Sequence, residues 1–168
     1  MLDYKQFEAL ILTPALQALQ LDSLSLLIAG TIAHESKGGT YIKQINGPAL
    51  GVCQIEDATF NSLWQSYLPN QAILTNKIMT LCQFSRVPKA YQMIYDMLLS
   101  VAMCAALYKW RLDSHKESSP LTIESCADCW IKYYNCGGKG TKDEFINDYK
   151  RWIGAVASTR PAKAKAST

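Results

Sequence analysis

The segment GTIAHESKGG, residues 30–39, places one acidic residue at the end of an apolar stretch that stops at two glycines. Counting back from Glu35 in helical steps, Ile32, Thr31 and Ile28 fall on the same face. That face is apolar, so we expect the Glu35 carboxyl to point toward the core or a cleft in it. Burial and the partial negative charge of a helix C-terminus both disfavour the anion, so we predict a raised pKa for Glu35. A carboxyl that keeps its proton near neutral pH can act as a general acid.

A solvated Glu35 beside Lys37 is the alternative when the helix is considered alone. Two later stretches favour the buried arrangement: GPALGVCQIEDATF at 47–60 and YYNCGGKGT at 133–141. Three motifs then follow one another: a helix-ending Glu-Ser, a glycine-rich loop leading to Gly-x-x-Gln before a helix, and a helix-ending Tyr-Asn-x-Gly. Together they resemble the lysozyme-like superfamily, specifically the lytic transglycosylases (the SLT type) and goose-type lysozymes. They also resemble the muramidase domains carried in bacteriophage virions.

The resemblance covers about residues 22 to 155. The matching residues are Glu35-Ser36 for the family's catalytic Glu-Ser, Gly51-Val52-Cys53-Gln54 for its Gly-Leu-Met-Gln, and Tyr134-Asn135 with Gly137 for its Ala-Tyr-Asn-Ala-Gly. Two positions depart from the family: Cys53 stands where it usually has Met, and Tyr133 where it usually has Ala. Both positions tolerate apolar side chains, so we expect altered packing rather than lost chemistry.

The resemblance implies a mainly α fold of the α+β lysozyme-like kind, in which a glycine-rich loop or short β-hairpin flanks the active-site cleft. It also implies cleavage of the β-1,4 bond between N-acetylmuramic acid and N-acetylglucosamine in peptidoglycan. Glu35 would be the catalytic acid, because a poor leaving oxygen needs a proton from a group that still carries one.

Five further residues gain substrate-binding roles from the resemblance. Ser36 is expected to orient the carboxyl or contact the sugar, and Gly51 and Gln54 are expected to line the cleft. Tyr134 is expected to pack beside the catalytic carboxyl and hydrogen-bond it, and Asn135 to brace its loop. Three of them also have a plainer alternative: Ser36 as a helix-end serine bonded back to a carbonyl, Gly51 as a simple turn glycine, and Tyr134 as a core tyrosine with a satisfied hydroxyl.

Most glycosidases pair the acid with a second carboxylate. Glu56 is the candidate here, although a solvated loop position suits it as well, and Asp57 is expected to cap the next helix. Lytic transglycosylases need no second carboxylate, because the same Glu turns from acid to base and the sugar's own 6-hydroxyl attacks to give a 1,6-anhydro product. We therefore expect a lytic transglycosylase. A hydrolytic muramidase and a catalytically inert virion or secretion-apparatus protein that binds glycan strands are the alternatives.

The composition sets limits on the class of protein. With 168 residues, 49% hydrophobic and 18% charged, the chain suits one globular domain, which we place at 1–155. A flexible basic tail, 156–168, carries Arg160, Lys163 and Lys165 and accounts for the net charge of +3. No basic stripe is interleaved with aromatic residues, so we expect no nucleic acid partner. No apolar run is long enough for stable membrane insertion.

Six cysteines and two histidines offer little other chemistry. A Cys126-x-x-Cys129 pair lacks the four ligands of a structural zinc site, so we expect no metal and no cofactor. His34 points about 100° away from Glu35 around the helix, and we expect a surface or lightly packed histidine rather than a catalytic partner. Trp130 is expected in the core rather than on a sugar.

The segment MLDYKQFEAL lacks the basic start and apolar run of a secretory signal. We therefore expect synthesis in the cytoplasm without a signal peptide and action at the bacterial cell wall or periplasm. A phage virion, a holin-like release or a dedicated secretion system would deliver the protein, so virion or secretion-apparatus proteins are expected partners beside peptidoglycan strands.

The spacing of apolar residues predicts a helical chain with loops at 37–52 and 114–120. The first expected helix, 4–19, is divided or kinked at Pro14. Asp22 or Ser23 caps the second, which runs to about 36, Asp57 caps the third, and a capping box of Thr141 and Glu144 opens the last, 142–155. The other expected helices are 71–84, 89–112 and 121–135. A short hairpin is the alternative for part of the first loop.

Overall fold

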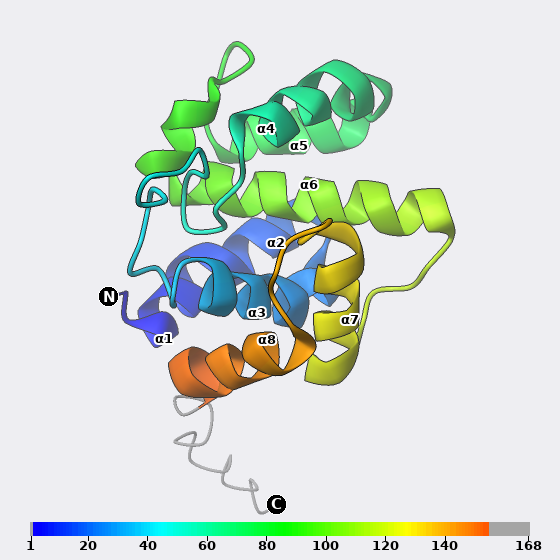
Figure 1. Ribbon diagram of the computed structural model, residues 1–168. Helices are drawn as coiled ribbons and strands as arrows, with labels where there is room; N and C mark the ends of the chain where they lie inside the picture. The colour runs from blue at the N-terminus through cyan, green and yellow to red at the C-terminus, as the bar shows by residue number, and fades with distance from the viewer. Residues whose placement is uncertain (1, 155–168) are drawn as a thin grey trace, which may run out of the picture.

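Helix α6 (Met97–His115) runs through the middle of the molecule in the computed structural model, which describes residues 2–154 (Figure 1). Its sequence, MLLSVAMCAALYKWRLDSH, is apolar on nearly every side along the first three turns, which is the pattern of a fully surrounded helix. The Asp96 carboxylate begins the helix by accepting a hydrogen bond from the Leu99 N–H at 2.9 Å. The other helices pack around this central element.

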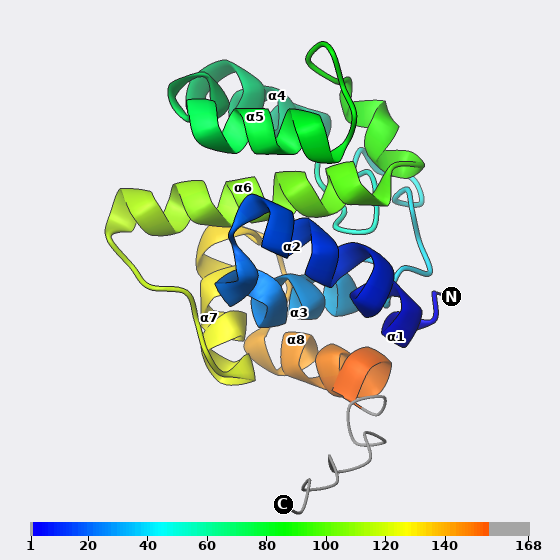
Figure 2. The same ribbon diagram turned by 180° about the vertical axis from the view of Figure 1, so that it is seen from behind.

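Two groups of helices lie on opposite sides of α6 in both views (Figures 1 and 2). One side holds α4 (Asp57–Ser62), continued by a π-helical turn at Leu63–Tyr67, and α5 (Ala72–Leu81). The other side holds α1 (Tyr4–Phe7), a π-helical turn at Glu8–Leu12, α2 (Thr13–Leu19), α3 (Ser25–Glu35), α7 (Ile123–Tyr133) and α8 (Lys142–Tyr149) with a final π-helical turn at Lys150–Gly154. Long-range packing therefore centres on α6 and α3.

The expectation of a mainly α fold is confirmed. Within residues 2–154 there is no β-strand, and the hairpin considered for the first loop is reduced to two isolated antiparallel bridges, Lys43 with Leu50 and Leu50 with Ile55. No helix in that part of the chain has the length and apolar character to cross a membrane. The proposed basic tail at 156–168 lies outside the described residues.

Two predicted helix starts are wrong, because the backbone begins each helix without a side-chain cap. α3 starts at Ser25 after a 3₁₀ turn, Asp22–Leu24, and its N-terminus receives no side-chain hydrogen bond. Asp57 is the first residue of α4 instead of its cap, and Glu56 before it makes no capping bond. A 3₁₀ turn satisfies early N–H groups through closer carbonyls, which removes the need for a cap.

Other boundaries follow local chemistry. The capping box is confirmed, since Glu144 accepts from the Thr141 N–H at 2.8 Å while Thr141 accepts from the Glu144 N–H at 3.3 Å. Residues 89–112 are not one helix: a 3₁₀ turn, Ala90–Ile94, precedes the Asp96 cap. At the N-terminus the π-helical turn directly precedes Pro14, whose ring nitrogen cannot donate to the helix ladder.

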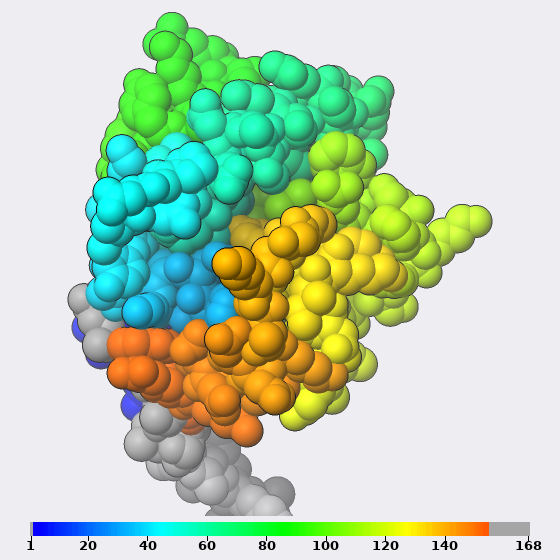
Figure 3. All heavy atoms as spheres, in the orientation of Figure 1, coloured from blue at the N-terminus to red at the C-terminus, as the bar shows by residue number. Residues whose placement is uncertain are grey.

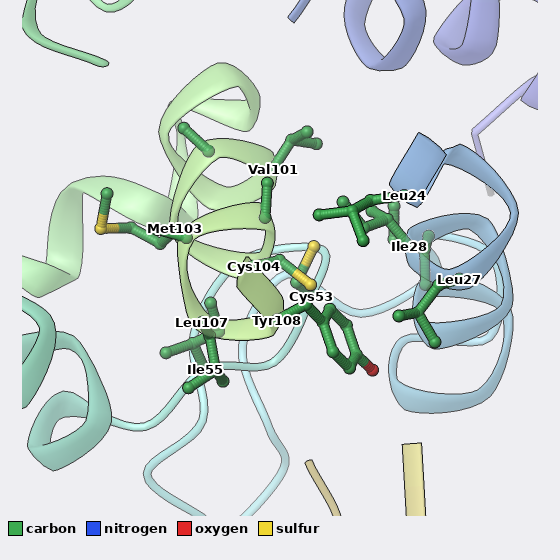
Figure 4. Packing of buried hydrophobic residues seen from close by; sticks show 14 of the residues in the cluster. Leu24, Leu27, Ile28, Cys53, Ile55, Val101, Met103, Cys104, Leu107 and Tyr108 are labelled. Carbon is green, nitrogen blue, oxygen red and sulfur yellow. The ribbon is translucent and has the colours of Figure 1, made fainter. Parts of the chain in front are cut away.

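Helix α3 is held between α6 and α8. Figure 4 shows Leu27 and Ile28 of α3, and Leu24 of the turn before it, packed toward α6. The Tyr108 hydroxyl of α6 lies 2.7 Å from the Thr31 hydroxyl of α3. On the other side Gly30 allows α8 to approach, because a Cβ added there would lie 2.4 Å from Cζ of Phe145. The position of Glu35, one turn further along α3, therefore depends on this close packing.

We predict that Gly30→Ala lowers the free energy of unfolding by up to about 2 kcal/mol. Overpacking against the Phe145 ring costs about 1–3 kcal/mol, while the better helix propensity of alanine returns about 1 kcal/mol. Urea unfolding measures the change. In a Phe145→Leu background, which removes the clashing ring, Gly30→Ala should become neutral or stabilising. An equal loss in both backgrounds would contradict this account of the α3–α8 contact.

Candidate active-site pocket

Glu35 lies half-buried at the C-terminal end of α3 and lines a pocket of about 510 Å³. Figure 3 shows the molecule hollowed between the loop that follows α3 and the segment 134–141. Burial raises the pKa of the Glu35 carboxyl above its ordinary value of 4.5, as the sequence predicted, against the opposing effects of a hydrogen bond from Trp130 and the charge of His34. The pocket thus contains a carboxyl that favours its protonated form.

Trp130 of α7 supplies the hydrogen bond that sequence reasoning missed. Its indole Nε1–H donates to Oε1 of Glu35 at 2.8 Å, while the ring is otherwise buried in the core as expected. The one available signal in the sequence is spacing: Trp130 lies four residues before Tyr134 and so shares its helix face. Among the described residues it is the side chain that hydrogen-bonds Glu35.

His34 is half-buried, which falls within the surface or lightly packed placement expected for it. Its Nδ1 lies 2.8 Å from Oδ2 of Asp148 on α8, and its ring packs edge-on against Trp130 with centroids 4.5 Å apart. The tight α3–α8 packing brings these groups together. His34 therefore acts on the neighbouring carboxyl through charge and through the indole, without contacting the pocket itself.

Ser36 ends α3 and turns the chain into the loop. Its buried hydroxyl donates to the Ile32 carbonyl at 2.9 Å and accepts from the Gly39 N–H at 2.9 Å. This is the plainer alternative considered for Ser36, and its side chain does not line the pocket. Lys37, not a glycine, is the first residue with a left-handed φ after the helix.

Gly51 and Gln54 form a turn that docks on α6. Gly51 has φ +73°, and a Cβ there would lie 2.4 Å from the Ser100 hydroxyl oxygen and 2.7 Å from the Met93 carbonyl oxygen, so only glycine fits. The Ser100 hydroxyl in turn accepts from the Cys53 N–H at 3.2 Å. Gln54 donates from Nε2 to the Gly51 carbonyl at 2.7 Å and lines the pocket. Gly51 therefore places Gln54 and does not itself line the pocket.

Tyr134 lines the pocket, but the hydrogen bond expected from it to Glu35 is wrong. Its hydroxyl donates to the Cys53 carbonyl at 2.6 Å, and its ring stacks on Tyr108 with centroids 5.3 Å apart. Burial raises the pKa of Tyr134 well above its ordinary value. The neutral Tyr134 hydroxyl therefore links the end of α7 to the loop that contains Cys53, whose carbonyl is the acceptor.

Asn135 and Glu56 complete the set of expected residues. Asn135 lines the pocket and donates from Nδ2 to the Gly140 carbonyl at 3.2 Å, which braces its loop as expected. Glu56 is exposed and lines the same pocket from the start of α4. The lining residues that the sequence did not single out are Gln44, Ala49, Ile55, Thr59, Leu107, Cys136 and Gly138.

The site shows no metal-binding arrangement. Among residues 2–154 no group of three or more His, Cys, Asp or Glu side chains is placed to hold a metal ion. All six cysteines are free thiols, and Cys126 and Cys129 lie buried in α7 with pKa values that burial raises to about 12. The pocket lining itself offers carboxyl, amide and hydroxyl groups and the thiol of Cys136.

Comparison with known proteins gives no match: no family model, no curated protein and no solved structure matches the chain. The three ordered motifs and the pocket that their residues share are accordingly the grounds for a functional assignment.

We predict that wild-type stability falls relative to Glu35→Gln as pH rises from about pH 4 to about pH 8. The folded-state pKa of Glu35 is raised, so its contribution to folding is fully present below the unfolded value of 4.5 and is lost as pH rises through the folded pKa. Gln keeps an acceptor for the Trp130 N–H. Urea unfolding across this range measures the difference.

Glu144→Gln is the control of opposite sign. Bonds from the Thr141 N–H and hydroxyl lower the pKa of Glu144, so the stability of wild type relative to this variant should be fully present above 4.5 and fall only as pH drops below it. Parallel pH curves for wild type and Glu35→Gln would show an ordinary, hydrated Glu35.

Proposed function

We propose that the protein is a peptidoglycan lytic transglycosylase with a lysozyme-like fold, cleaving the β-1,4 bond between N-acetylmuramic acid and N-acetylglucosamine with Glu35 as its single catalytic group. The observation that carries the proposal is a carboxyl of raised pKa lining a pocket together with Gln54, Tyr134 and Asn135. These residues come from the three motifs that resemble the family. They lie up to about a hundred positions apart in the chain, so sharing one pocket is not a consequence of local sequence.

The chemistry follows from one carboxyl used twice. Glu35 gives its proton to the glycosidic oxygen as the bond from that oxygen to C1 of the muramic acid breaks. The resulting carboxylate takes the proton of the 6-hydroxyl on the same sugar while that oxygen bonds to C1. Glu35 is then protonated again, no water is consumed, and the product ends in a 1,6-anhydro ring.

The pocket suits a sugar chain in size and in chemistry. Its volume of about 510 Å³ falls in the range of small-molecule sites, about 300–1,000 Å³. The amides of Gln44, Gln54 and Asn135 and the hydroxyl of Thr59 line it beside the apolar Leu107. Amide and hydroxyl groups pair with sugar hydroxyl and acetamido groups.

A hydrolytic muramidase is the second candidate, and Glu56 favours it. This carboxyl lines the same pocket as Glu35, and inverting and retaining glycosidases use a second carboxylate in the site of the acid. Glu56 is exposed, whereas Glu35 is half-buried, so the two carboxyls lie in different surroundings. The products separate the two enzymes: hydrolysis gives reducing ends.

The proposed partner is the glycan strand of peptidoglycan at the bacterial cell wall or in the periplasm, with delivery by a phage virion or a secretion apparatus. An inert glycan-binding component of such an assembly is the third candidate. The half-buried Glu35 carboxyl of raised pKa argues against this candidate, since a binding protein gains nothing from the cost of desolvating a carboxyl.

We predict that wild type clears purified cell walls and that Glu35→Gln lowers the rate by at least about 10²-fold, because amide cannot supply the proton. Glu56→Gln is the matched control and should keep near-wild-type activity with 1,6-anhydro ends identified by mass spectrometry. Loss of activity in Glu56→Gln together with reducing ends would instead establish the hydrolase. If well-folded wild-type protein leaves the cell walls intact, the inert glycan-binding component is the remaining candidate.

A further inference from the structure

Trp130 restricts how the Glu35 carboxyl can hold its proton. An indole N–H only donates, so Oε1, which accepts this bond at 2.8 Å, must present a lone pair to it. A proton placed on the other oxygen leaves that bond undisturbed. We propose that Trp130 positions Glu35 so that Oε2 is the oxygen that carries and transfers the acid proton. This rests on the proposed function, in which Glu35 is the acid.

The indole is itself held by three helices. Trp130 is 1% exposed on α7, and its ring packs against Phe145 of α8 at 5.3 Å and against His34 of α3 at 4.5 Å between centroids. His34 is fixed by its 2.8 Å contact with Asp148 of α8. The N–H is therefore aimed at Oε1 by packing that does not involve the substrate.

The same bond serves both halves of the proposed reaction. While Glu35 is protonated, the bond sets the rotation of the carboxyl and so the direction of the Oε2 proton. After proton transfer, Oε1 belongs to a carboxylate, to which an N–H donates more strongly. Trp130 acts through Glu35 and lines no part of the pocket, so it is a positioning residue.

The test replaces the indole N–H without opening the core. Trp130→Phe keeps an aromatic ring but removes the donor. Trp64→Phe is the matched control, because its buried Nε1 has no hydrogen-bond partner and Trp64 does not line the pocket. Both variants are assayed with a soluble, uncross-linked glycan fragment of peptidoglycan, and kcat and KM are followed against pH.

We expect kcat of Trp130→Phe to fall about tenfold, the cost of a misoriented reacting group, with KM nearly unchanged because no substrate contact is lost. The alkaline limb of its pH profile should move to higher pH, since the lost bond favoured the carboxylate. Trp64→Phe should match wild type in kcat, in KM and in its pH profile. If Trp130→Phe keeps wild-type kcat and pH profile, the positioning role is refuted while the proposed function stands.

A second measurement needs neither activity nor a folded variant at position 130. The indole ¹⁵N–¹H resonance of Trp130 in the wild type should titrate with the Glu35 carboxyl and lose that titration in Glu35→Gln. An indole signal that ignores the Glu35 titration overturns the inference, whatever the activity. Inactive wild type with a titrating indole would remove the proposed function and keep the Trp130–Glu35 coupling.

Discussion

The rest of the site depends on the Glu35 carboxyl, whose ionisation is unfavourable in its surroundings. Glu35 is held at the end of α3, where desolvation favours the protonated form and a single indole N–H favours the anion. Burial is the larger of the two effects, so the pKa is raised. The balance depends on α3 being packed on α6, α7 and α8, because a helix end exposed to water would restore an ordinary acid.

Helix α6 is the support on which the rest of the pocket is built. Ser100 receives the turn that contains Gly51 and Cys53, and Tyr108 bonds Thr31 of α3 while stacking on Tyr134. Figure 4 shows Cys53 of the loop beside Cys104 of α6, deep in the same core. The two loops that flank the pocket are thus anchored to one rigid helix, which limits how far their side chains can drift from Glu35.

The residues around the acid are neutral partners rather than competing charges. Burial raises the pKa values of Tyr108, Tyr134 and Cys104 well above their ordinary values, so these groups keep their protons and add no charge beside Glu35. The charge that does act on Glu35 comes from His34, on the side away from the pocket.

Local sequence determined the helical character of the chain, the Thr141 capping box and the burial of Glu35, because helix periodicity and capping act within one or two turns. The order of the three motifs also pointed to residues that do share a pocket. Sequence misplaced the starts of α3 and α4, where 3₁₀ and extended geometry replaced side-chain caps. Ser36 and Gly51 do not line the pocket as the sequence predicted, and each instead has a structural role in the turn it belongs to.

Only the tertiary structure decided which groups meet at Glu35. Trp130 is 95 positions away from it, and the Tyr134 hydroxyl finds the Cys53 carbonyl 81 positions away. No period or motif encodes such a pairing, because it is set by how α7 and α8 pack on α3 through contacts as close as Gly30 with Phe145. The sequence alone therefore identifies Glu35 as the candidate acid, whereas the packing of the helices determines that Trp130 is its hydrogen-bond donor.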